Sequence, residues 1–223
     1  MLSGIELVVF DFDGVILESA QIKTDAFREM FGDDARAVGY HLAHQGISRF
    51  EKFRFYREQV LGLAFDDAVS VQMNADFDAI VQHRILAAPF VAGAVELLDG
   101  LRGRIPLYIA SGTPEVELRR IVAARELEDY FDGVFGSPAS KGVIAAQALS
   151  RHAVSCEQGL FIGDATADLD GAIAAGMLFV GRVAVGHPNP FSTVSALTVR
   201  DLAELADAWD GSCSVAMLER SRR

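Results

Sequence analysis

The chain has 223 residues, of which 51% are hydrophobic and 23% are charged, a composition typical of a globular protein. This length fits one domain with an insertion, or two small domains. The formal net charge of −11 disfavours binding to nucleic acid, because an acidic surface repels a phosphate backbone. No uncharged apolar run reaches the roughly 18 residues of a membrane span, and residues 1–4 lack the layout of a signal peptide. Cys156 and Cys213 stand in no metal-binding or redox spacing, which favours a reduced, cytoplasmic setting.

A buried strand is predicted at residues 7–10, because four consecutive apolar residues, two of them β-branched, are typical of a strand covered on both faces. The strand ends in Asp11 and Asp13. Residues two apart on an extended chain point to the same side, so both carboxylates can face one point. Two like charges there require a cation, a shared proton or both. The alternative is a turn in which Asp13-Gly14 merely ends the strand.

The remaining pattern divides the chain into a helical part and an alternating part. A helix is predicted over 20–31, followed by a segment to residue 88 with helical spacing and no strand. From Pro89 onward, helices are expected at 91–102, 114–126, 141–151 and 167–175, and strands at 105–110, 134–135, 160–162 and 178–180. This alternation predicts an α/β fold with a Rossmann-like parallel sheet, formed by residues 1–17 and 89–223. Residues 18–88 are then an inserted α-helical cap domain, placed to cover the carboxyl ends of the strands, where such sheets bind ligands.

Three further polar segments follow predicted strands. In Ser111-Gly112-Thr113-Pro114, Thr113 is expected to cap a helix that starts at Pro114, and the free amides and hydroxyl suit a phosphate. Lys141 opens a helix, where it opposes the helix dipole unless an anion lies nearby. Gly163-Asp164 follows a buried strand, and Asp168 lies about one turn beyond Asp164, so both can approach one site. Ordinary caps and a solvated lysine are the alternatives, although capping does not explain two strands that both end in acid.

Taken together, these segments resemble the four motifs of the haloacid dehalogenase (HAD) superfamily, in the same order and at similar intervals. They are Asp11-Phe-Asp13-Gly-Val, Ser111-Gly-Thr, Lys141 and Gly163-Asp164-Ala-Thr-Ala-Asp168. The helical insertion resembles the small cap of the phosphoglycolate phosphatase and β-phosphoglucomutase branches. The resemblance implies a Mg²⁺-dependent phosphatase acting on a small phosphorylated metabolite, either a sugar phosphate or a short phosphorylated acid. We expect a monomer or homodimer, and the acidic charge and the lack of a long apolar run predict no nucleic-acid or membrane partner.

The resemblance also assigns roles to the motif residues. Asp11 is the expected nucleophile that forms an aspartyl-phosphate, and Asp13 is the expected acid and base. The Mg²⁺ ligands are expected to be the Asp11 carboxylate, the Asp13 backbone carbonyl and Asp164. The remaining roles fall to Ser111, Gly112 and Lys141, which hold the phosphoryl oxygens, and to Asp168, which supports the metal shell or Lys141. Aspartate at position 13 argues against carbon–halogen cleavage, because the true dehalogenases of the superfamily lack it.

Two cap positions bear on the substrate. Gly46-Ile47-Ser48-Arg49 resembles a stretch of β-phosphoglucomutase whose arginine holds a distal phosphate, so Arg49 is expected to grip a second anionic group. The alternative is a helix capped by Ser48 and followed by a solvated arginine. Lys23 stands where the mutase has a histidine linked to general-acid control, and is a candidate contact for a substrate anion. This difference disfavours the alternative of a phosphomutase. A non-catalytic phosphate-binding protein is a further alternative.

Overall fold

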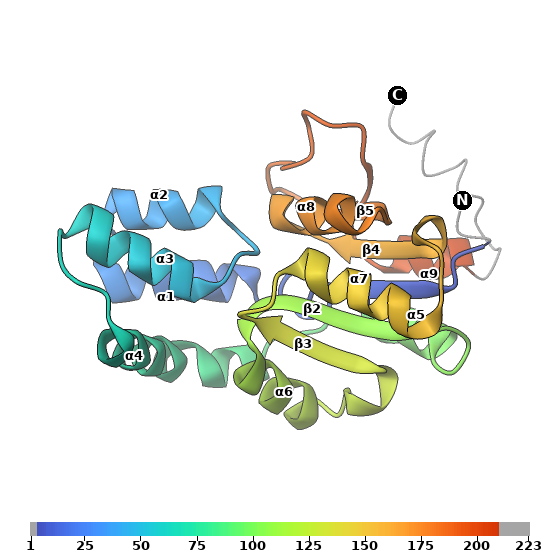
Figure 1. The fold of residues 1–223 in the computed structure, drawn as a ribbon, viewed down its shortest axis with the longest axis horizontal. Coiled ribbons are helices and arrows are strands. Elements are labelled where there is room, and N and C mark those ends of the chain that lie inside the picture. The colour runs from blue at the N-terminus through green and yellow to red at the C-terminus, as the bar shows by residue number, and fades with distance from the viewer. Residues whose placement is uncertain (1–3, 210–223) are drawn as a thin grey trace.

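A six-stranded parallel sheet forms the centre of the larger part of the molecule in the computed structural model, which describes residues 4–209 (Figure 1). The strand order is β3-β2-β1-β4-β5-β6, and every pair of neighbours runs parallel. The strands are β1 (Leu7–Phe10), β2 (Leu107–Pro114), β3 (Gly133–Ser137), β4 (Gly159–Gly163), β5 (Leu178–Arg182) and β6 (Leu197–Val199). The predicted Rossmann-like α/β fold is confirmed.

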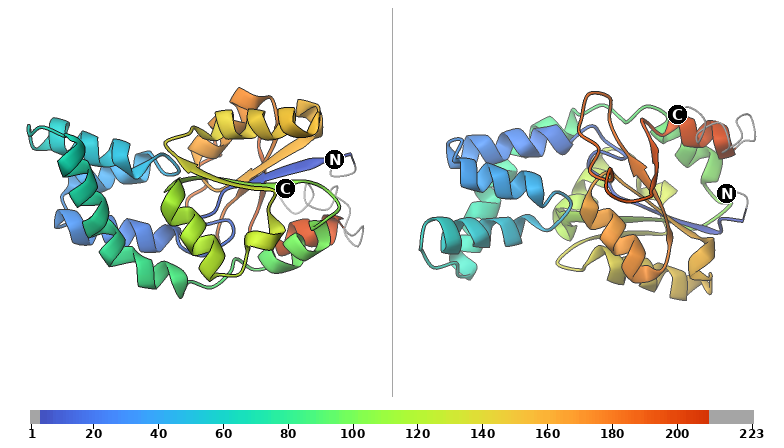
Figure 2. Two further views of the ribbon diagram at one scale, coloured as in Figure 1. Left: turned by 60° about the horizontal axis from the view of Figure 1, so that its bottom comes forward. Right: turned by 90° about the horizontal axis from the view of Figure 1, so that it is seen from above.

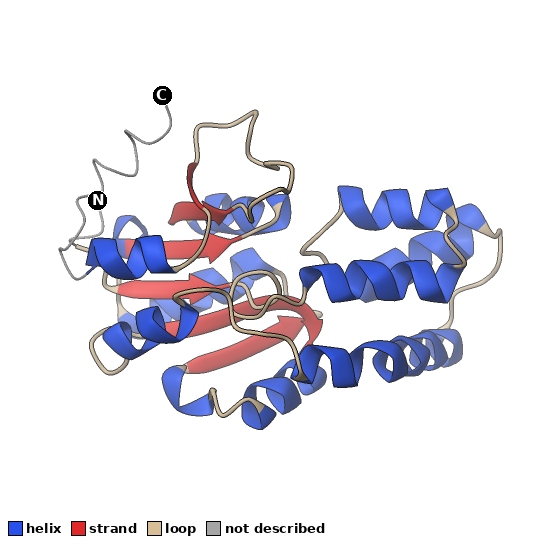
Figure 3. Ribbon diagram, turned by 180° about the vertical axis from the view of Figure 1, so that it is seen from behind, coloured by secondary structure: helices blue, strands red, loops and turns tan. Residues whose placement is uncertain are grey.

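The helices fall into two groups (Figures 1 and 3). Between β1 and β2 the described chain forms α1 (Ala20–Phe31), α2 (Ala35–Ala43), α3 (Arg49–Phe55), a π-turn (Tyr56–Val60) and α4 (Asp67–Leu86). These elements lie together to one side of the sheet and contain no strand, so we call residues 20–86 the cap (Figure 2). The helices of the core are α5 (Ala94–Leu101), α6 (Glu115–Ala124), α7 (Lys141–His152), α8 (Thr166–Ala175) and α9 (Ala203–Trp209). No helix among residues 4–209 is long and apolar enough to span a membrane.

The central strand β1 is covered on both faces, as its uninterrupted apolar sequence predicts. Val8 and Phe10 belong to the hydrophobic cluster that includes α5, α6 and α9. Leu7 and Val9 point the other way and pack with residues of α7 and α8. None of these four side chains is exposed to solvent. Burial on both faces holds β1 rigidly between β2 and β4, so the residues that follow it have a defined position.

The prediction that Thr113 caps a helix starting at Pro114 is wrong. Strand β2 continues through Pro114, which pairs with Ser137 of β3, and α6 begins at Glu115. Pro114 has φ −53° and ψ 134°, so its fixed φ fits the extended chain as well as it would fit a helix.

Two elements near the end of the described chain are not anticipated by the sequence pattern. They are β6 and α9, and β6 has only three residues, too few to show a period of two. Residues 186–190 lie in the loop between β5 and β6, as their composition indicates. Cys213 and the basic tail at 219–223 lie outside the described residues.

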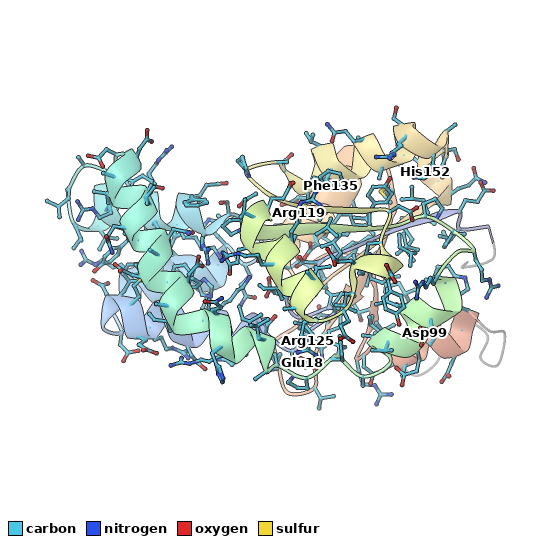
Figure 4. The ribbon with its side chains drawn as sticks, turned by 90° about the horizontal axis from the view of Figure 1, so that it is seen from below. Glu18, Asp99, Arg119, Arg125, Phe135 and His152 are labelled. Atoms are coloured by element: carbon cyan, nitrogen blue, oxygen red, sulfur yellow. The ribbon has the colours of Figure 1, made fainter. Side chains whose placement is uncertain are left out.

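Two neighbouring linkers join the cap to the core. The amide of Glu18 in the first linker donates to the carbonyl of Pro89 in the second, at 2.9 Å. Arg125 of the core donates to the carbonyls of Leu86 and Ala88 at 2.9 and 2.6 Å, and thereby binds the end of α4 (Figure 4). The boundaries 17/18 and 88/89 stay a prediction, which these adjacent linkers support.

Candidate active site

The structure gathers the predicted core residues at the carboxyl edge of the sheet. Asp11 and Asp13 follow β1, Ser111 lies near the end of β2, and Asp164 follows β4. All four line one cavity between the sheet and the cap, together with Gly112, Lys23 and Arg49. Lys141, at the start of α7, reaches the same place, with its Nζ 3.1 Å from Asp11 Oδ2. Segments far apart in the sequence therefore meet because the carboxyl ends of parallel strands lie at one edge.

Lys141 is held between two carboxylates. Its ammonium donates to Asp168 Oδ1 at 2.5 Å and lies against Asp11. Asp168 Oδ2 in turn accepts from the Ala165 amide at 3.0 Å, so the acid is bonded at both oxygens. Burial alone would lower the pKa of Lys141, but Asp11 and Asp168 outweigh it, and the pKa is raised. Nearby anions thus explain a lysine in the first turn of a helix.

Asp11 lies in an environment that disfavours its charge. It is 3% exposed, and its Oδ1 accepts from the Phe12 amide at 2.7 Å. Burial, with a further contribution from the charge of Asp168, raises the pKa of Asp11 to about 7, although Lys141 acts in the opposite direction. Further positive charge beside Asp11 would therefore stabilise its ionised form.

Asp13 is surrounded by hydrogen-bond donors. Ser19 donates to Oδ1 at 2.6 Å, and Thr113 donates to Oδ2 at 2.9 Å. The Lys23 ammonium bonds to the same Oδ2 and lies 2.5 Å from Thr113 Oγ1. Burial alone would raise the pKa of Asp13, but Lys23 and the three hydrogen bonds lower it. The cap thus contributes a cation to a core carboxylate when it lies against the sheet.

Sequence reasoning missed Thr113 and Ser19 as parts of this site. The signal for Thr113 was present, since it lies two residues after Ser111 on an extended segment and therefore points to the same side. Nothing in the sequence around Ser19 marks it, because its contact depends on how the chain turns after β1.

The donor set fits a divalent cation. Oxygens of Asp11, Asp164 and Asp168 lie within 4.8 Å of one another. Asp168 is already bonded to Lys141, whereas the Asp164 carboxylate accepts no hydrogen bond from the described residues. Burial, and then the charges of Asp11 and Asp168, raise the pKa of Asp164. With Asp13, the site contains four carboxylates, and these form ion pairs with only two lysines, Lys23 and Lys141. A cation that prefers oxygen ligands would balance the excess negative charge.

Arg49 lies at the cavity but is not solvated, being only 6% exposed. Its Nη2 bonds to Asp78 of the cap at 2.6 Å and to Glu117 of core helix α6, and its Nε donates to Asn74 at 2.8 Å. Its Nη1 is buried without a partner among the described residues. Burial raises the pKa of Glu117 to about 7, with Arg49 opposing that effect. The sequence also allowed a helix capped by Ser48 and followed by a solvated arginine. The cap is present, because Ser48 accepts a hydrogen bond from the Phe50 amide at 3.4 Å.

Comparison with known proteins identifies the class. A model of the haloacid dehalogenase-like hydrolase family matches residues 5–176, so the chain belongs to this family of enzymes. It is 27% identical over 224 residues to phosphoglycolate phosphatase of Rhodospirillum rubrum, covering 92% of this chain and 90% of that protein.

Two further similarities extend the comparison. The chain is 28% identical over 178 residues to the tyrosine-protein kinase PtkA of Mycobacterium tuberculosis, covering 77% of this chain. It spans 60% of the length of that relative. A solved hydrolase from Pseudomonas syringae superposes with a TM-score of 0.71 at 21% identity, covering 91% of this chain and 98% of that one, which shows a shared fold.

The crowding of carboxylates predicts a stability that depends on pH and on metal. Because the pKa of Asp11 is about 7 in the folded state and 3.8 as a free side chain, the folded state binds more protons between these values and loses stability as the pH rises through them. In chelator-treated protein at pH 8, the free energy of unfolding of Asp11→Asn should therefore exceed that of the parent. This difference in the free energy of unfolding should be smaller at pH 5 by about 2–3 kcal/mol. Urea unfolding at both values measures this.

Other titrating groups, including His41 and Glu117, are common to both proteins and cancel in the difference between their free energies of unfolding. Asp164 is the exception, because the charge of Asp11 helps to raise its pKa, and its contribution changes in the same direction as that of Asp11. A difference that stays constant from pH 5 to pH 8 would show that Asp11 is ionised throughout.

Proposed function

We propose that the protein is a Mg²⁺-dependent phosphatase that hydrolyses a small phosphomonoester through an aspartyl-phosphate, acting in the cytoplasm. The observation that carries this proposal is the single cavity lined by Asp11, Asp13, Ser111 and Asp164, with Lys141 bonded to Asp11 at its edge. A nucleophile, a second carboxylate, a hydroxyl and a cation thus converge on a space that a tetrahedral phosphoryl group can occupy. The phosphatase relative from Rhodospirillum rubrum supports the same reaction.

In the first step, Asp11 attacks the phosphorus, the bond to the ester oxygen breaks, and the leaving oxygen takes a proton from Asp13. The hydrogen bond from the Phe12 amide to Oδ1 orients Asp11, so that Oδ2 is the attacking atom. Ser111, the Gly112 amide and Lys141 hold the phosphoryl oxygens, where fixed donors stabilise the charge that develops.

Asp13 acts as acid first and as base second. The Lys23 contact keeps it ionised before substrate binds, which is the form that removes a proton from water in the second step. A bound phosphate dianion nearby raises the pKa of a carboxyl group, and so favours the protonated form that the first step uses. Hydrolysis of the aspartyl-phosphate then restores Asp11 and releases phosphate.

Mg²⁺ would be held by the carboxylates of Asp11 and Asp164 and by the backbone carbonyl of Asp13. When bound, it neutralises the acidic cluster and allows a dianionic ester to approach. Asp168 then keeps Lys141 in place rather than binding the metal directly, because both of its oxygens are already bonded.

A phosphomutase would use the same first step and then transfer the phosphoryl group to another hydroxyl. We favour hydrolysis because Lys23 stands where the mutase has a histidine linked to general-acid control, and because the phosphoglycolate phosphatase relative is matched over 90% of its own length. The two reactions are separated by labelling the intermediate with ³²P and following whether the label reaches inorganic phosphate or a second sugar position.

Replacing Asp11 with asparagine should abolish phosphate release, by a factor of about 10⁴ or more, because an amide cannot form the covalent intermediate. Phosphate release from p-nitrophenyl phosphate and from a panel of phosphorylated metabolites measures this, with circular dichroism as the check on folding. Turnover at the parental rate would refute the nucleophile assignment.

Removal of divalent metal should abolish turnover, and Mg²⁺ should restore it. Because a ligand that binds only the folded state stabilises it, saturating Mg²⁺ at 100 times its Kd should add about 2.7 kcal/mol to the free energy of unfolding. Thermal unfolding with and without Mg²⁺ measures this. Asp164→Asn should reduce the thermal shift, whereas Asp170→Asn, an exposed change in the same segment, should retain it.

For Arg49 we propose a structural role in closing the cap, in place of a direct grip on a second anion. Its guanidinium is shared by Asp78 of the cap and Glu117 of the core, so its charge is already balanced and it ties the two parts together.

Arg49→Ala should therefore raise KM by similar factors for p-nitrophenyl phosphate and for a substrate with two anionic groups. Arg54→Ala, an exposed change on the same helix, is the control. A rise in KM for the doubly anionic substrate alone would instead show that Arg49 binds the second anionic group directly.

A further inference from the structure

The chain contains three lysines, Lys23, Lys52 and Lys141, and the structure brings all three to the same region. Lys23 is bonded to Asp13, and Lys141 is bonded to Asp11 and Asp168. Lys52, on α3 of the cap, forms no ion pair with any residue among 4–209, although it lines the cavity that contains the proposed nucleophile. It is only 6% exposed. A buried ammonium without an anionic partner is costly, and the mechanism above does not use it.

The surroundings of Lys52 hold it in position without neutralising it. Its Nζ lies 3.2 Å from His41 Nδ1 and 5.5 Å from the centre of the Phe27 ring. Thr24 Oγ1 donates to the Ala20 carbonyl at 3.2 Å and lies 3.0 Å from His41 Nε2. The histidine therefore donates through Nε2 and presents an unprotonated Nδ1 to the lysine. His41 is neutral, because burial and then the Lys52 charge lower its pKa to about 3.

The charges around Lys52 favour an incoming anion. Burial, followed by the like charges of Lys23 and Lys141, lowers the pKa of Lys52 to about 7, and Asp13 and Glu51 only partly oppose this. An anionic group beside Nζ would offset the loss of hydration and reduce the repulsion among the lysines.

The charge of Lys52 is the one left to balance in this cavity. Among the described residues, the other cations that line the cavity, Lys23 and Arg49, each form an ion pair, whereas Lys52 does not. The single negative charge of a carboxylate would balance Lys52, whereas a second phosphoryl dianion would bring an excess of negative charge into a buried position.

We propose that Lys52 binds a carboxylate on the leaving group, so that the substrate is a short phosphorylated carboxylic acid. This inference rests on the proposed phosphatase function and narrows its substrate class. Lys52 is then a residue that determines specificity, and His41 is a positioning residue that orients its ammonium.

The test compares 2-phosphoglycolate with ethyl phosphate, which is similar in size and lacks the carboxylate. Lys52→Met removes the charge and keeps an unbranched apolar stem. We expect it to lower kcat/KM for 2-phosphoglycolate about 10- to 100-fold more than for ethyl phosphate, the range expected for a lost charge-assisted hydrogen bond. Lys52→Arg should recover part of the difference. Arg54→Met, which removes the same charge from an exposed position of α3, should leave the ratio of the two substrates unchanged.

A binding measurement makes the test independent of turnover. In the Asp11→Asn background, calorimetric titration with each ester should show that Lys52→Met weakens binding of 2-phosphoglycolate by the same factor relative to ethyl phosphate. Equal losses for both esters would overturn the role of Lys52 while leaving the phosphatase proposal intact. Failure of the parent enzyme to hydrolyse either ester, with selective binding preserved, would refute the phosphatase proposal and retain the carboxylate site.

Discussion

Charge balance at the carboxyl edge of the sheet is the constraint on which the rest of this structure depends. Two buried strands end in acid, and their carboxylates meet within 4.8 Å of one another. At an effective dielectric constant near 20, two unit charges 4 Å apart interact by about 4 kcal/mol, so several uncompensated carboxylates would oppose folding. The bond from Lys141 to Asp168 and its contact with Asp11 remove part of this cost. The remainder gives the site its affinity for a cation and, through it, for an anionic ester.

Close packing around these charges explains why glycines accompany the acidic residues. A Cβ atom on Gly14 would lie 2.0 Å from Asp164 Oδ2, and its φ of +78° is one that other residues rarely adopt. On the other side of the site, a Cβ on Gly112 would lie 2.6 Å from the Gly46 carbonyl of the cap. The core and the cap therefore meet backbone to backbone, which places the side chains of α1 and α3 within reach of the reacting group.

The sequence predicted the core of the site better than the cap for a physical reason. Asp11 and Asp164 each follow a strand, Ser111 lies near the end of a strand, and Lys141 opens a helix. Parallel strands bring such positions together whatever the details of packing. Contacts of the cap depend on how its helices lie on the sheet, which no local pattern encodes. Arg49 was therefore expected to bind a ligand anion, while its partners Asp78 and Glu117 lie 29 and 68 residues away in the chain. Lys52 showed no signal at all, since a lysine on an amphipathic helix is ordinarily solvated.

The position of the cap connects these observations. Lys23 reaches Asp13, and Arg49 reaches Glu117, only because the cap lies against the core. If the cap moved away from the core, Asp13 would lose the cation that lowers its pKa, and the buried arginine and glutamate would each have to be hydrated separately. The protonation state of the proposed acid and base would then be coupled to the position of the cap. Because a bound anion in the cavity would contact groups from both parts, substrate binding and assembly of the catalytic site would favour each other.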